Sequence, residues 1–168
     1  MQSEMDLVRE LGREIPVNLP RIIRALGIRY DERFMPADES GRIERDDDGY
    51  MIVVNATEGE QRRRFTAAHE LAHYLLHRDL LHREGHLDRL FGPPGTNPSS
   101  PFTPRHEVQA NRLAADLLMP ADAVRAYEEM GLEVGEMARR FGVSPAAMRI
   151  RLQSLGLLAP ERGAPAHF

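Results

Sequence analysis

The stretch that decides the fold is Phe65-Thr-Ala-Ala-His-Glu-Leu-Ala-His-Tyr-Leu-Leu-His77, near the middle of the chain. It predicts the greater part of one long helix over residues 60–77, opened by Thr57 or Glu58. The apolar side of this helix is expected to consist of Phe65, Ala68, Ala72, Leu75 and Leu76. The polar residues of the stretch are then held at fixed angles to one another by the helix.

Two histidines of this helix, His69 and His73, are separated by four positions. On a helix they lie about 40° apart in projection and about one turn apart along the axis, so both imidazoles can bind one metal ion. Glu70 is rotated by about 100° from His69. It would lie beside the metal without binding it, where a carboxylate can act as the base on zinc-bound water.

A catalytic zinc ion needs a third protein ligand and an open position. The best candidate is Glu107, on a helix expected over residues 105–118, because the intervening loop lets that helix fold back across the first. Asn111 lies four residues later on the same face and could accept the free N–H of a ligating histidine. His106 should point about 100° away from Glu107 and is not expected to be a ligand.

A hairpin is expected before the long helix, over residues 41–55. Its turn is Asp46-Asp-Asp-Gly49, and the strand over residues 50–54 is almost continuously apolar, which suggests burial on both faces. The run over residues 92–104 is rich in glycine and proline and is expected to be a loop, either a lid over a substrate groove or a connector.

Short helices and one short strand complete the expected secondary structure. The helices are expected at 3–13, 18–27, 122–130, 134–141 and 145–155, and the strand at 28–30. The last two helices, joined by Gly142-Val143-Ser144 and carrying several arginines, have the cadence of a helix-turn-helix. This pair could contact DNA, dock a DNA-binding partner, or complete the core.

The composition is that of a soluble globular protein of 168 residues, with 42% hydrophobic and 29% charged residues. A net charge of −4 argues against direct binding of DNA. The chain has no cysteine, so no thiolate can bind a metal and nothing points to secretion. Without a signal peptide or an apolar run long enough to span a membrane, the protein is expected to be cytoplasmic.

Two linked segments resemble the signatures of the ImmA/IrrE family of metallo-endopeptidases. The first is the stretch that ends at His77, and the second is Glu107-Val-Gln-Ala-Asn-Arg-Leu-Ala-Ala-Asp-Leu-Leu-Met-Pro120. The hairpin strand up to Asn55 also fits, so the resemblance covers roughly residues 20–120. Leu113 stands where many relatives have phenylalanine, which we interpret as a substitution in the core.

The resemblance implies roles for four residues. His69, His73 and Glu107 would bind zinc, and Glu70 would be the general base for hydrolysis of a peptide bond. Manganese or iron could occupy the same set of ligands. The implied substrate is a helix-turn-helix repressor or an antitoxin, whose cleavage releases genes of mobile elements or of a stress response.

The implied fold is α+β and resembles a minimal thermolysin. A small antiparallel β-sheet is expected to pack on a helical core that carries the His-Glu-x-x-His motif. We expect a metallopeptidase domain at residues 1–125, a small helix-turn-helix-like segment at 126–160, and a frayed tail at 161–168. The sequence carries no signal for the oligomeric state.

Several residues near the motif allow two interpretations. His77 continues the histidine stripe one turn beyond His73, and Tyr74 follows directly, so either could stabilise an oxyanion or contact substrate. His77 could equally be a structural residue, whereas packing in the core or an interface is the favoured role of Tyr74. His82 and His86 could line the cleft or bind a second metal, and otherwise would be solvated.

Two other functions compete with the peptidase. A DNA- or protein-binding transcriptional regulator on a peptidase-like scaffold predicts a broken motif, but all four site residues are present. A purely structural zinc ion would favour a fourth protein ligand, and it gives no role to Glu70.

Overall fold

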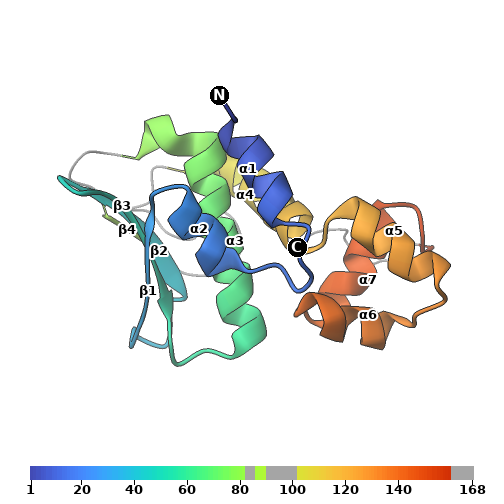
Figure 1. Ribbon diagram of the computed structural model, residues 1–168. Helices are drawn as coiled ribbons and strands as arrows, with labels where there is room; N and C mark the ends of the chain where they lie inside the picture. Colours follow the sequence, from blue (N-terminus) through green and yellow to red (C-terminus); the bar gives the residue numbers. More distant parts are fainter. Residues whose placement is uncertain (82–85, 90–101, 160–168) are drawn as a thin grey trace.

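The long helix α3 (Glu60–His77) runs through the centre of the protein, with the sheet on one side and most of the other helices on the other (Figure 1). The computed structural model describes residues 1–81, 86–89 and 102–159. Every residue of α3 from Thr66 to Tyr74 is buried. The helix is therefore covered on all sides over two turns, whereas Leu76, expected on its apolar side, is 48% exposed.

The described residues form one four-stranded sheet in the order β1-β3-β2-β4. Its strands are β1 (Arg29–Arg33), β2 (Gly41–Asp46), β3 (Gly49–Asn55) and β4 (His86–Arg89). The predicted hairpin is confirmed: β2 and β3 pair antiparallel, from Gly41 opposite Val54 to Asp46 opposite Gly49. All residues of β3 from Met51 onward are buried, as its apolar sequence predicts.

The sheet is mixed, whereas an antiparallel sheet was expected. The tight turn at Gly49 keeps β2 beside β3, so β1 occupies the remaining edge of β3 and runs parallel to it. The crossing between β1 and β2 is held by Asn55, whose side-chain amide donates to the carbonyl oxygens of Met35, Pro36 and Glu39. β4, which the sequence did not predict, pairs antiparallel with β2.

A glycine lets the sheet approach α3 closely. A Cβ atom at Gly41 would lie 2.5 Å from the Cγ2 atom of Thr66 on α3 and 2.7 Å from the carbonyl oxygen of Val53. Any larger residue in this position of β2 would push the helix away from the sheet. Gly41 on β2 therefore allows α3 to pack close to the sheet.

Three helices surround α3 and begin at side-chain caps. They are α1 (Glu4–Leu11), capped by Ser3; α2 (Leu19–Ala25), capped by Asn18; and α4 (Pro104–Leu118), capped by Thr103. α1 ends two residues before the end expected from the sequence, as commonly happens at frayed helix termini, and α2 ends at Ala25, close to its predicted stop at Gly27.

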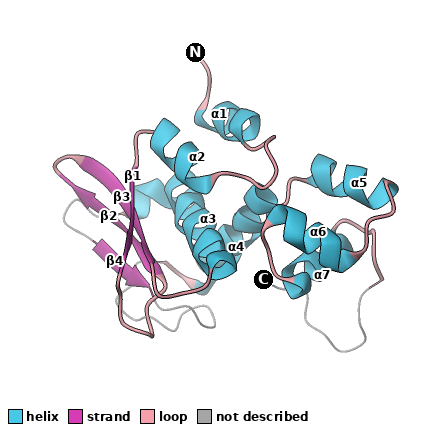
Figure 2. Ribbon diagram, turned by 60° about the horizontal axis from the view of Figure 1, so that its bottom comes forward, coloured by secondary structure: helices cyan, strands magenta, loops and turns pink. Residues whose placement is uncertain are grey.

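The last three helices lie together beyond α4 (Figure 2). They are α5 (Ala121–Glu129), α6 (Val134–Phe141) and α7 (Pro145–Ser154), and Ser144 caps α7 as predicted. Gly142 ends α6 in the left-handed conformation, with φ of 67°. The α6–α7 pair has the expected helix-turn-helix connectivity, while the division of the chain near residue 125 stays a prediction.

Two arginines join these last helices to the rest of the protein. The guanidinium group of Arg64 on α3 donates to the carbonyl oxygens of Val17, Phe141 and Gly142. Burial lowers the pKa of Arg64. On α7, Arg151 donates to the carbonyl oxygen of Met119 and to the carboxylate of Asp116.

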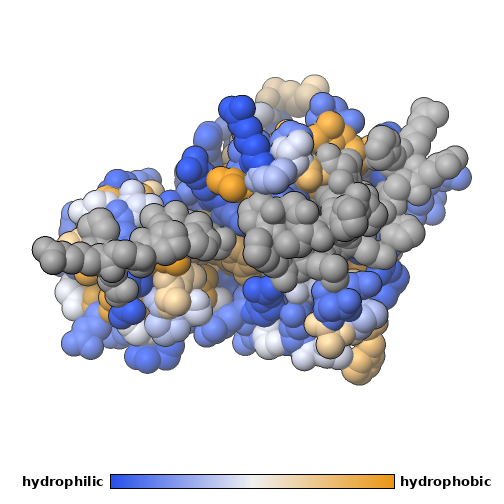
Figure 3. All heavy atoms as spheres, turned by 180° about the vertical axis from the view of Figure 1, so that it is seen from behind, coloured by the Kyte–Doolittle hydropathy of each residue, from blue (hydrophilic) through white to orange (hydrophobic). Residues whose placement is uncertain are grey.

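The surface is mostly hydrophilic over the described residues in Figure 3, where apolar side chains form small, separate groups. Among the helices that the structure describes, none has the length and apolar character needed to cross a membrane. Three predicted features lie outside the described residues: His82, residues 92–101 of the predicted loop over 92–104, and the predicted tail from residue 161.

Candidate metal centre

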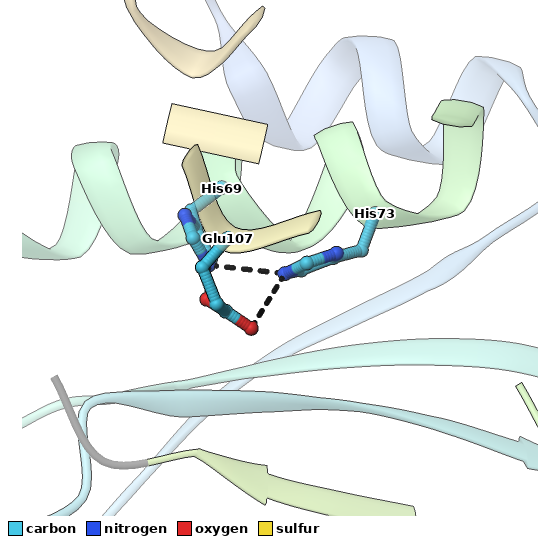
Figure 4. A group of neighbouring side chains, drawn as sticks. All are labelled: His69, His73 and Glu107. Atoms are coloured by element: carbon cyan, nitrogen blue, oxygen red, sulfur yellow. Dashed lines mark hydrogen bonds and ion pairs between the residues drawn. The ribbon is translucent and has the colours of Figure 1, made fainter. Parts of the chain in front are cut away.

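Three side chains from α3 and α4 point toward one another in the interior (Figure 4). They are His69, His73 and Glu107, the residues that the sequence predicts as metal ligands, and their ligand atoms all lie within 4.8 Å of one another. The side chains of His69, His73 and Glu107 are only 2%, 0% and 12% exposed, respectively. The structure therefore brings the predicted ligands together in a largely buried position.

The spacing of the ligand atoms suits a tetrahedral ion. The Nε2 atoms of His69 and His73 are 3.2 Å apart. One carboxylate oxygen of Glu107 lies 3.2 Å from Nε2 of His69, and the other lies 3.5 Å from Nε2 of His73. Zinc–nitrogen bonds of 2.0–2.1 Å in a tetrahedron separate neighbouring ligand atoms by about 3.3 Å. The donor set of two imidazoles and one carboxylate thus fits zinc in both chemistry and size.

The position of Glu107 depends on how α4 begins. Thr103 and His106 form a reciprocal capping box: the Thr103 hydroxyl accepts from the backbone N–H of His106, and Nδ1 of His106 accepts from the backbone N–H of Thr103. The backbone N–H of Glu107 donates to the carbonyl oxygen of Thr103. The side chain of His106 is thus engaged at the helix start, in agreement with its not being expected as a ligand.

Glu70 is fully buried and follows His69 on α3, as the motif requires. Asn111 is half-buried on α4, one turn after Glu107. The roles of Glu70 as base and of Asn111 as partner of a ligating histidine stay predictions.

Tyr74 on α3 contacts both α1 and the strand β3. Its hydroxyl donates to the carboxylate of Glu4 on α1, at 3.3 Å. Its ring meets that of Tyr50 edge-on and carries the guanidinium group of Arg78 on its face, 3.9 Å from the centroid. Burial raises the pKa of the Tyr74 hydroxyl. These contacts agree with the packing role of Tyr74, and its role as an oxyanion donor stays a prediction.

His77 lies behind His73 and is only 5% exposed. Its Nδ1 atom is 3.0 Å from Nδ1 of His73, and its Nε2 atom is 2.9 Å from the side-chain oxygen of Gln109 on α4. Both ring nitrogens of His77 are thus engaged on the far side of His73 from the other ligands. The predicted role of His77 as a donor to an oxyanion or to substrate stays a prediction.

Phe102 and Gln109 were missed by the sequence analysis. The ring of Phe102 is stacked on that of His73, with centroids 3.8 Å apart and planes inclined by 7°. Neither residue stands at a position that a helix period or a known motif would single out. Only the folding of α4 against α3 brings them to the histidines.

Comparison with known proteins gives a match to one family model and similarity to solved structures. The sequence model of the family described as "Peptidase_M78: IrrE N-terminal-like domain" matches residues 24–153. A solved structure of a "Mycobacterium tuberculosis transcriptional regulator" is similar in fold, with a TM-score of 0.57 and 19% sequence identity. The match covers 95% of this chain and 48% of that one, so this chain spans about half the length of that protein. No curated protein matches the sequence.

Proposed function

The chain belongs to the family of IrrE N-terminal-like domains, Peptidase_M78, and on this premise we propose that it is a zinc-dependent endopeptidase. The observation that carries the proposal is the spacing of the ligand atoms of His69, His73 and Glu107, 3.2–3.5 Å between neighbours. Two neutral imidazoles and one carboxylate leave a fourth position open, as in catalytic zinc sites. Zinc held there would supply Lewis-acid chemistry, lowering the pKa of a water molecule and polarising a carbonyl oxygen.

The protein's own residues would bind the ion and transfer the protons. His69 and His73 offer their Nε2 lone pairs, while the carboxylate of Glu107 offsets part of the positive charge of the ion. The Glu70 carboxylate takes a proton from the attacking water, whose oxygen bonds to the peptide carbon. Glu70 then returns a proton to the leaving amine as the carbon–nitrogen bond breaks. The burial of Glu70 next to His69 supports this role, because the interactions of a carboxylate are stronger where bulk water is excluded.

Metal content tests the site directly. We expect about one zinc per chain in the wild-type protein and in Glu70→Gln, and much less in His73→Ala. Mass spectrometry would also distinguish zinc from manganese and iron. If none of the three proteins holds metal after zinc is supplied, the proposed metal centre is wrong.

The substrate we propose is a helix-turn-helix repressor or an antitoxin, in the cytoplasm. The family resemblance supports this class, and we propose that the α6–α7 pair, with its helix-turn-helix connectivity, docks such a protein. Incubation with purified repressors encoded nearby should give one defined cleavage. Glu70→Gln should reduce the rate by at least about a hundredfold while it retains zinc. Cleavage at the wild-type rate by Glu70→Gln would rule out this base.

A second candidate function is a transcriptional regulator that binds DNA through α6 and α7. The similarity in fold to a transcriptional regulator and the helix-turn-helix connectivity support it, with Arg139, Arg140 and Arg149 exposed on these helices. Sequence-specific retention of DNA on a gel, lost on substitution of these arginines by alanine, would favour this function. Cleavage without DNA retention would favour the peptidase.

A further inference from the structure

We propose that His77 and Gln109 are positioning residues that hold His73 in the tautomer with its proton on Nδ1. The inference rests on the proposed metal site, because this tautomer leaves the Nε2 lone pair of His73 facing His69 and Glu107. A histidine can bind a metal through Nε2 only when that nitrogen carries no proton.

The positions of the protons on His73 and His77 follow from the contact between His77 and Gln109. The side-chain oxygen of Gln109 can only accept a hydrogen bond, so Nε2 of His77, 2.9 Å away, must donate to it. A neutral His77 that carries its proton on Nε2 has a bare Nδ1. That nitrogen lies 3.0 Å from Nδ1 of His73, which must then donate. Gln109 thus fixes the proton of His77 on Nε2, and His77 in turn fixes the proton of His73 on Nδ1.

Packing fixes the ring planes that these contacts require. His73 is fully buried, with the Phe102 ring stacked flat on it. The ring of His106 lies 4.6 Å from that of His77, between centroids. Since His73 and His77 are one turn apart on α3, their side chains lie on the same face of the helix.

Without the acceptor at His77, no hydrogen bond from His73 to His77 favours the tautomer of His73 with its proton on Nδ1. The other tautomer would place an N–H between Nε2 of His69 and a carboxylate oxygen of Glu107, which lie 3.2 Å and 3.5 Å away. In metal-free protein the Glu107 carboxylate would accept that proton readily. We call the contacts from His73 through His77 to Gln109 the relay. In the metal-free protein, the relay therefore stabilises the tautomer of His73 that can bind a metal ion.

Histidine nitrogen NMR on the metal-free, full-length chain tests the tautomer itself. At about pH 8, where ordinary imidazoles are neutral, we expect His73 to carry its proton on Nδ1 in the wild-type protein. His77→Phe keeps an aromatic ring but removes the acceptor, so His73 should shift toward the Nε2–H tautomer. The signals are assigned by their loss in His73→Gln.

Zinc affinity, measured by competition with a chelator, gives the second readout. We expect His77→Phe to bind zinc about 10–100-fold more weakly than the wild-type protein. His77→Gln, whose side-chain oxygen can accept from His73, should recover most of this loss. Gln109→Leu changes an exposed residue outside the core and should cause a smaller loss in the same direction, even if His77→Phe fails to fold.

The outcomes separate this inference from the proposed function. An unchanged His73 tautomer together with zinc affinities within about twofold of wild type in Gln109→Leu and the His77 variants overturns the relay. A wild-type protein that binds no zinc overturns the proposed metal centre instead. The tautomer in the metal-free protein is then still measured and still decides whether the relay exists.

Discussion

Phe102 covers one face of His73 and is itself only 5% exposed. Truncation of Phe102 to alanine removes the stacked ring and opens the ligand to water. We expect Phe102→Ala to lower the free energy of unfolding of the metal-free protein by about 3 kcal/mol, as is usual for a buried phenylalanine. Urea denaturation would measure this loss. Phe34→Ala is the matched control: that ring is 89% exposed, so its loss should change the stability by less than about 0.5 kcal/mol.

Tyrosines dominate the alkaline titration of the chain, because all of its 22 basic residues are arginines and it has no lysine. Burial and a hydrogen bond to Glu32 raise the pKa of Tyr30, and burial raises the pKa of Tyr74. The folded state therefore holds these protons at a pH at which the unfolded chain has released them.

Stability should then be complete below about pH 10, the pKa of an unperturbed tyrosine, and should fall as the pH rises above it. We expect the double variant Tyr30→Phe/Tyr74→Phe to lose less stability between about pH 9 and pH 11 than the wild-type protein does. Urea midpoints across this range measure the difference. Parallel pH dependences of the two proteins would show that these hydroxyls are not responsible.

The four predicted site residues could be found from sequence because their geometry is local. His69, Glu70 and His73 share one helix, whose period fixes their angles, and Glu107 opens the next long helix. The partners behind the ligands could not be found in this way. Gln109 meets His77 only because of how α4 packs against α3, and no spacing rule encodes that packing.

At the scale of the element, the start of α4 controls one ligand. Loss of the Thr103 cap frays the turn in which Glu107 makes its first backbone hydrogen bond. We expect Thr103→Ala to cost about 1 kcal/mol of stability and to weaken zinc binding severalfold. Ser144→Ala removes the equivalent cap from α7, away from the ligands, and should cost similar stability with no change in zinc affinity. Equal zinc affinities in both variants would contradict the role of this cap.

The helices and the hairpin were predictable because each is encoded by signals within a few residues. The caps at Ser3, Asn18 and Ser144 and the turn before Gly49 are all of this kind. The parallel pairing of β1 was not predictable. It depends on which edge of β3 stays open after the hairpin has formed.

At the scale of the whole molecule, one guanidinium group joins three parts of the chain. Arg64→Met would leave the carbonyl oxygens of Val17, Phe141 and Gly142 without these donors. We expect a loss of about 2–4 kcal/mol and faster amide hydrogen exchange in α6 and α7. Arg62→Met is the control, because Arg62 is 45% exposed and lies 3.9 Å from Glu58, so this ion pair should contribute little. Unchanged exchange in α6 and α7 would show that Arg64 does not hold these helices.

β1 is an edge strand of the described sheet, and its sequence also affects the association of one molecule with another. An edge strand presents backbone donors and acceptors that can pair with the sheet of another molecule and seed fibres. Four of the five residues of β1 are charged and exposed: Arg29, Asp31, Glu32 and Arg33. Charged side chains on an edge strand discourage such pairing, so the sequence that finishes the sheet also discourages aggregation.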